Sequence, residues 1–138
     1  QMCIRDSTAA GVDVRIGTDG AASSGTGLNM LNEAKMAALV QRHDHWDATL
    51  LPANDVFSMA TKGSDDWAVW NLNDVRMRPT GRSNNRHLAN LIFNGAECLD
   101  LWVDGHAVRL DGETRTLDEK QAWVDLERSI ESYYEGIE

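Results

Sequence analysis

One carboxylate, Asp19, stands where an apolar strand is expected to end. Val12, Val14 and Ile16 alternate with polar residues, and a period of two is typical of a β-strand. Residues 17–20 then read Gly-Thr-Asp-Gly, whose two glycines permit a sharp exit from the strand. In parallel α/β sheets and barrels, sites are built at the carboxyl ends of the strands. Asp19 is therefore the first candidate for chemistry, and the alternative is that its Asp-Gly pair serves only the turn.

The other chemistry-bearing residues give weaker signals. Residues 43–45 read His-Asp-His, but no apolar strand precedes them, so surface or hinge histidines are favoured over metal ligands. Ser23 and Ser24 lack a Gly-x-Ser-x-Gly elbow and an ordered histidine partner, so neither is predicted to be a nucleophile. His87 and His106 are isolated, and exposed or hydrogen-bonded histidine is the expected state of both.

Two helices are expected to follow the Asp19 segment. The first covers residues 28 to about 42 and is apolar almost all round, so we expect it to be covered on more than one side. Pro52 is predicted at the first position of the second helix, and Gly63 at its end. These helices would complete a strand–loop–helix unit around the carboxylate.

The second half of the chain changes in composition. A strand-like pattern begins at Trp67, and residues 73–85 look like a loop. Arg76, Arg78 and Arg82 in it, with Arg86 just after it, make this region locally basic. For these arginines, a solvated loop or a set of internal salt bridges is favoured, and contact with a phosphate or substrate anion is the alternative. Residues 88–93 are compatible with either a helix or a strand.

A hairpin and a helix are expected at the end of the chain. Residues 98–103 and 106–110 are predicted to be strands joined at Asp104-Gly105. Residues 116–119 are predicted to form a capping box that opens a helix. The buried stripe of this helix is expected to consist of Trp123, Leu126, Ile130 and either Tyr133 or Tyr134.

Composition narrows the classes of partner. The chain of 138 residues carries a formal net charge of -9, which disfavours nucleic-acid backbones and anionic membranes. No apolar run approaches the roughly 20 residues of a membrane span, and no secretory leader is visible. Cys3 and Cys98 form no disulfide framework, so a cytoplasmic protein is expected. The five tryptophans are expected to be buried.

Two stretches, GTDGAASSGTGLNMLNEAKMAALVQ and LPANDVFSMAT, resemble the last βα unit and following helix of the metal-dependent amidohydrolase superfamily. WAVWNL and LDLWVDGHAVRLDGETRTLDE look like the C-terminal strands and final helix of the same proteins. The likeness is to the branch that acts on cytosine, on nucleosides such as methylthioadenosine and adenosylhomocysteine, and on triazines. A complete (β/α)8 barrel takes roughly 250 residues. The resemblance therefore implies only the C-terminal part of an enzyme.

The resemblance implies a role for Asp19 as a metal ligand that takes part in proton transfer, and a substrate-binding role for Ser23 in the loop beside the metal. It implies a divalent metal, Zn2+ in preference to Fe2+, and a small heterocyclic substrate. Such a metal supplies hydroxide at neutral pH by lowering the pKa of bound water. The remaining ligands would lie outside this chain, so the fragment alone is expected to be inactive. A homo-oligomer is also compatible with the resemblance.

The expected α/β organisation has four parts. Residues 1–10 are expected to be a non-native or disordered leader, residues 11–63 the last βα unit of the barrel with the following helix, residues 64–115 the strands of a small β-sandwich domain, and residues 116–138 a C-terminal helix. The alternative hypothesis is a non-catalytic α/β module whose exposed apolar faces serve assembly.

Overall fold

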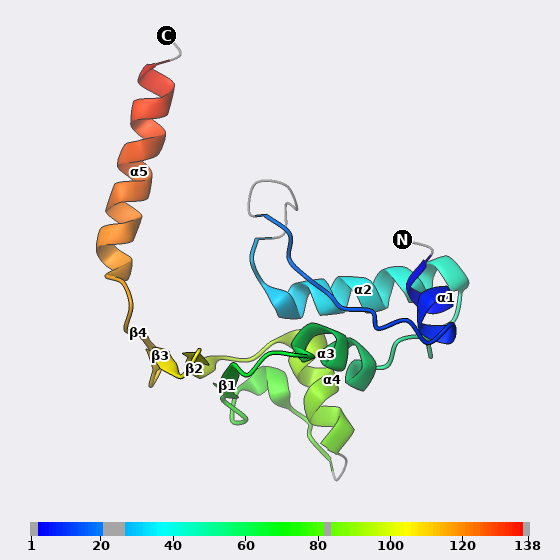
Figure 1. Ribbon diagram of the computed structural model, residues 1–138. Helices are drawn as coiled ribbons and strands as arrows, with labels where there is room; N and C mark the ends of the chain where they lie inside the picture. Colours follow the sequence, from blue (N-terminus) through cyan, green and yellow to red (C-terminus); the bar gives the residue numbers. More distant parts are fainter. Residues whose placement is uncertain (1–2, 21–26, 82–83, 137–138) are drawn as a thin grey trace. The chain divides into compact units, whose positions relative to one another are not determined.

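Two compact units make up the chain in the computed structural model, which describes residues 3–20, 27–81 and 84–136 (Figure 1). The first unit is drawn from Gln1–Ser64 and Leu72–Ala96, and the second from Asp65–Asn71 and Glu97–Glu138. The first is helical, and the second contains a small antiparallel sheet and one long helix. Residues 72–96 thus belong with the helices, whereas the composition pattern predicted them to be part of the β-sandwich domain.

Three helices form the core of the first unit. They are α2 (Met30–His45), α3 (Ala53–Thr61) and α4 (Asn84–Asn94), and each contacts the other two. A short 3-10 helix, η1 (Val75–Met77), lies against α4. Residues 88–93, ambiguous from sequence, are therefore helical. The shared core contains small and branched side chains, namely Ala34, Ala38, Leu51, Ala53, Val56 and Ile92.

Helix α2 begins on a side-chain cap. The Asn29 side chain accepts hydrogen bonds from the Leu31 and Asn32 amides, which would otherwise lack partners in the first turn. Both α3 and α4 contact this helix, as expected of a helix covered on more than one side. Met36 and Leu39 nevertheless remain 46% and 42% exposed, so one face is open within the described residues.

Arg42 fixes the connection that follows α2. Its guanidinium donates to the carbonyl oxygens of Leu50, at 2.9 Å, and Leu51, at 3.1 Å. The same group lies 5.0 Å from the centre of the Phe93 ring, a cation–π contact with α4. One side chain therefore holds the helix connection and the facing helix together.

The N-terminal residues are ordered as a short helix. Helix α1 covers Cys3–Ala9, and Ile4 packs against the core of the first unit. The sequence predicted a non-native or disordered leader over residues 1–10, and residues 3–9 of that stretch are helical. A helix of seven residues with one apolar anchor is too short to show a helical period in the sequence.

The segment of residues 12–18 forms no β-ladder with any other described part of the chain, so the predicted strand is not formed. From Val14 onward, alternate side chains are nevertheless half-buried, whereas Val12 is 57% exposed. Val14, Ile16 and Thr18 are half-buried, while Asp13 and Arg15 are exposed. A strand is defined by its neighbours' hydrogen bonds, and those neighbours are not supplied by the described residues.

The sheet of the second unit has the order β1-β2-β3-β4. Its strands are β1 (Trp67–Trp70), β2 (Cys98–Val103), β3 (His106–Leu110) and β4 (Glu113–Thr114), and all pairs are antiparallel. The predicted hairpin is confirmed, with Asp104-Gly105 as its turn. Trp67 and Trp102 are paired across β1 and β2, and their rings stack with centroids 5.1 Å apart. Trp67 is still 50% exposed, and Trp46 and Trp123 are more so, which means that the expectation of buried tryptophans is wrong for these three.

Helix α5 (Glu119–Glu135) begins later than predicted. Asp118, not Thr116, is its N-cap, and the Asp118 carboxylate accepts from the Lys120 and Gln121 amides. The predicted stripe of α5 is exposed along its whole length, so the expectation of its burial is also wrong. No helix within the described ranges has both the length and the apolar character needed to cross a membrane.

Candidate functional site

Asp19 lies at the end of the segment whose alternate side chains are half-buried. Ile16 packs against the helical core, and its amide donates to the carbonyl oxygen of Met59 in α3 at 3.0 Å. Asp19 follows three residues later and is exposed. The backbone of Asp19 is left-handed, with φ of 55°, and its Oδ1 accepts a hydrogen bond from the Gly20 amide at 2.7 Å. That bond uses one carboxylate oxygen, and an ionised carboxylate has a second oxygen with which it can accept a hydrogen bond or coordinate a metal.

Three Asp-Gly pairs in the chain share this backbone conformation. Asp104 and Asp111 have φ of 49° and 51°, and both precede a glycine at the end of a strand. Asp and Asn adopt the left-handed region more readily than other residues with side chains. The local geometry of Asp19 is therefore that of a turn aspartate, and it does not by itself separate a turn role from a chemical one.

Charge near this segment is concentrated at Asp13. The Asp13 carboxylate pairs with Lys62 Nζ at 2.6 Å and with Arg15 Nη2 at 3.3 Å. The hydrogen bond from Lys62 is the main reason that the pKa of Asp13 is lowered from its ordinary value of 3.8, and the bond from Arg15 adds to it. Sequence reasoning missed this pairing, because the partner lies 49 residues away and no local pattern signals it.

The described residues cannot hold a catalytic metal alone. A zinc site needs three or more protein ligands, and no group of three His, Cys, Asp or Glu side chains lies close enough within the described ranges. Asp19 is a single carboxylate ligand, so the implied metal does not fit this chain by itself. A complete site would need ligands from further polypeptide.

Among the described residues, the histidines of residues 43–45 form no metal-ligand cluster with Asp19. Ser23 and Ser24 lie outside the described residues. His43 stacks against Trp46 just after α2, and His45 Nδ1 lies 3.4 Å from Arg5 Nη1. The exposed side chain of His43 agrees with the interpretation of a surface residue, whereas His45 is half-buried and its Nε2 is buried.

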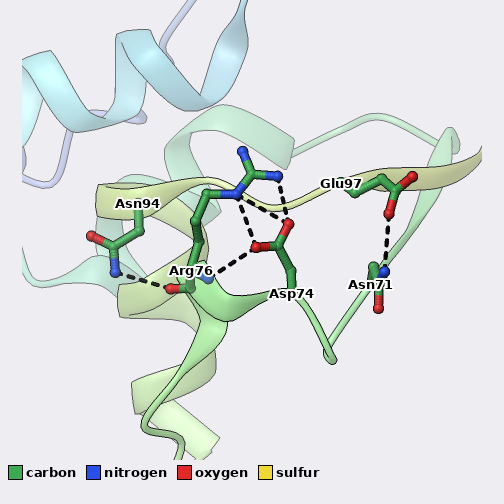
Figure 2. A network of polar contacts seen from close by, with 5 residues as sticks. All are labelled: Asn71, Asp74, Arg76, Asn94 and Glu97. Carbon is green, nitrogen blue, oxygen red and sulfur yellow. Dashed lines mark hydrogen bonds and ion pairs between the residues drawn. The ribbon is translucent and has the colours of Figure 1, made fainter.

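One arginine of the basic loop at residues 73–85 forms an ion pair with an aspartate of the same loop. Figure 2 shows Arg76 beside Asp74, with Arg76 Nε 3.0 Å from each carboxylate oxygen. Asn94 in α4 donates to the Arg76 carbonyl oxygen at 3.1 Å, so the same residue is held at its backbone (Figure 2). In the second unit, Asn71 donates to Glu97 Oε2 at 2.9 Å (Figure 2). For Arg76, the internal ion pair is therefore confirmed over an anion contact.

Known proteins similar to this chain include members of an enzyme family that matches its N-terminal half. Residues 2–64, which include Asp19 and its anchoring segment, match the amidohydrolase family. The chain is 33% identical over 149 residues to a 5-methylthioadenosine/S-adenosylhomocysteine deaminase of Desulforudis audaxviator, in an alignment that covers 94% of this chain. It is 34% identical over 128 residues to the deaminase of the same name from Pyrococcus abyssi, over 80% of this chain.

Two solved structures have a fold similar to that of this chain. An adenosine deaminase from Xanthomonas campestris with bound zinc superposes with a TM-score of 0.74 at 23% identity, over 88% of this chain and 31% of the other. An amidohydrolase from a Sargasso Sea environmental sample gives a TM-score of 0.68 at 23% identity, over 97% and 34%. The chain spans about a third of the length of the curated relatives, 34% and 29% for the two named above. Residues 2–64 therefore match the amidohydrolase family, and most of the chain is similar to deaminases of which it covers about a third.

Proposed function

We propose that this chain is the C-terminal part of a metal-dependent aminohydrolase built on a (β/α)8 barrel. In this proposal the enzyme acts on a C–N bond of a heteroaromatic base, a nucleoside or a triazine in the cytoplasm. The observation that carries it is the alignment of 94% of the chain with a 5-methylthioadenosine/S-adenosylhomocysteine deaminase. That relative's name favours an adenosine-type nucleoside among these substrate classes.

Asp19 is the proposed ligand and proton-transfer residue of this chain. It lies within the matched residues 2–64, and the Gly20 amide bonds to only one of its oxygens. The proposed metal is Zn2+ in preference to Fe2+, supported by the zinc in the Xanthomonas campestris neighbour. Ser23 is proposed to line the substrate pocket. The other ligands would come from polypeptide outside this chain, because the described residues contain no cluster of three.

An activity assay of the unmodified 138-residue chain tests this proposal. The purified 138-residue chain, supplied with Zn2+, is assayed for ammonia release from methylthioadenosine, cytosine and a triazine. We expect no turnover, because a single carboxylate does not make a catalytic zinc site. Turnover that depends on added metal would contradict the split site, and it would show that the chain holds enough ligands.

A second candidate function is a non-catalytic interaction module. It is favoured by one observation, the exposed apolar stripe of α5. Size-exclusion chromatography and metal analysis separate the two candidates. A monodisperse, cooperatively unfolding monomer would support the module, and a self-associating chain that the missing part of the barrel restores to a monomer would support the fragment.

A further inference from the structure

We propose that the C-terminal turn of α3 is the platform that positions the Asp19 segment, with Lys62 and Gly63 as positioning residues. The proposal deepens the proposed function, since it rests on Asp19 being a residue of the site. It concerns two residues to which no catalytic or ligand-binding motif in the sequence draws attention.

Two contacts join the segment to α3 and the residue after it. The Ile16 amide donates to the Met59 carbonyl oxygen at 3.0 Å, and Lys62 Nζ donates to Asp13 Oδ1 at 2.6 Å. The partners are three residues apart in both segments and run in opposite directions, so the contacts define one antiparallel alignment. A shift of the segment along α3 would break both contacts together.

Arg15 supplies a third contact at the same turn. A side-chain carbon added at Gly63 would lie 2.8 Å from Arg15 Nη1, so the guanidinium occupies the space that a larger residue would need. Gly63 has φ of +79°, a conformation that residues with side chains rarely adopt. Arg15 Nη2 also lies 3.3 Å from Asp13 Oδ2. One carboxylate oxygen of Asp13 therefore accepts a hydrogen bond from Lys62, and the other accepts one from Arg15.

Among the described residues these contacts hold the segment, because no β-ladder does so there. In the proposed barrel, neighbouring strands would hold the segment as well, and the contacts with α3 would add to them. Asp19 is three residues beyond Ile16, a reach of at most about 11 Å in an extended chain. A functional side chain must be held to within about 0.5 Å of its productive position. The platform therefore fixes the point from which residues 17–19 extend and limits where the carboxylate can lie, although ordinary surface ion pairs add little to overall stability.

Amide hydrogen exchange of the 138-residue chain tests the platform without any activity. In Lys62→Met, the Ile16 amide is expected to exchange about two to five times faster, the range for loss of an exposed ion pair. Lys62→Arg is expected to restore protection. Lys120→Met, which removes the same charge from α5, is the control and should leave Ile16 unchanged. Equal exchange at Ile16 in wild type and Lys62→Met would overturn the proposal.

A glycine pair gives an independent test of the Arg15 contact. Gly11 and Gly63 both have positive φ, but nothing lies within 4 Å of a carbon added at Gly11. Alanine strains the backbone at both positions, and only Gly63→Ala displaces Arg15. Exchange at Ile16 is therefore expected to rise in Gly63→Ala beyond its value in Gly11→Ala. Equal effects of the two variants would exclude a specific role for Gly63.

The platform and the proposed function can fail separately. In a chimera, this chain replaces the aligned third of the Desulforudis audaxviator deaminase. Lys62→Met is expected to lower kcat more than it changes KM, with unchanged metal content, and Lys62→Arg is expected to restore kcat. Full kcat in Lys62→Met, together with a strict need for Asp19, would reject the platform alone. Full activity of Asp19→Asn would reject the function, and the exchange results would still decide the platform.

Discussion

Aspartates before glycine serve the turns of this chain, and one of them is also the candidate for chemistry. Asp104 and Asp111 turn the strands of the sheet, and Asp19 shares their left-handed backbone. The motif around Asp19 could be found from the sequence because it combines an alternating apolar run with a Gly-Thr-Asp-Gly exit. The sequence could not decide whether Asp19 is a metal ligand, because a turn aspartate and a ligand at this position have the same backbone conformation.

Folding stability separates these roles at the residue scale. Asn tolerates left-handed backbone as Asp does, so Asp19→Asn is expected to change the free energy of unfolding by less than about 0.5 kcal/mol. Thermal unfolding of the 138-residue chain provides the measurement, with Asp104→Asn as the matched control at another Asp-Gly pair. A large loss of stability in Asp19→Asn alone would make Asp19 a structural residue.

At the scale of elements, helices α2, α3 and α5 were predicted, whereas α1 was not and the type of α4 was left open. The strand predicted before Asp19 is not formed among the described residues. Helix α2 and the hairpin carry their own signals, in the apolar pattern of the helix and in the turn at Asp104-Gly105. A strand depends on partners elsewhere, and residues 14–18 retain only the alternating burial of one. The ion pair between Asp13 and Lys62 could not be predicted either, since ion pairing across 49 residues leaves no periodic trace.

The Asp13–Lys62 contact predicts a pH dependence at this scale. Because the folded-state pKa of Asp13 is lowered, its stabilising effect is present above the ordinary value of 3.8 and is lost as the pH falls through the lower folded-state pKa. The difference in melting temperature between wild type and Asp13→Asn should therefore be constant from neutral pH to about pH 5. It should shrink below pH 3.8. A difference that persists undiminished in that acid range would contradict the ion pair.

The whole molecule carries exposed apolar stripes that its two units leave uncovered. Leu28, Met36 and Leu39 remain exposed in and just before α2, and α5 has no buried residue. The sequence predicted these stripes correctly as apolar but placed them in a core. The chain spans about a third of its relatives, 34% for the first of them, and a stripe can be buried only where its neighbours are present.

Self-association is the expected consequence at the scale of the whole molecule. Sedimentation velocity of the wild-type chain should show oligomers that grow with concentration, because exposed apolar patches favour association. Trp123→Gln with Leu126→Gln should reduce that association, since both residues lie on the exposed stripe of α5. Arg128→Gln, on the same helix, is the control. A wild-type chain that stays monomeric at all concentrations would contradict this expectation.

The most direct test of the central claim is the rate of ammonia release from methylthioadenosine by the chimera with the Desulforudis audaxviator deaminase. The rate is measured for the unchanged chimera, for its Asp19→Asn variant and for its Asp104→Asn variant as the control. Loss of a group that acts on the reacting atoms typically costs at least about 100-fold. We therefore expect Asp19→Asn to lower kcat by that factor or more and Asp104→Asn to leave it unchanged. Equal rates for the Asp19→Asn and Asp104→Asn chimeras would contradict a role for Asp19 in the site.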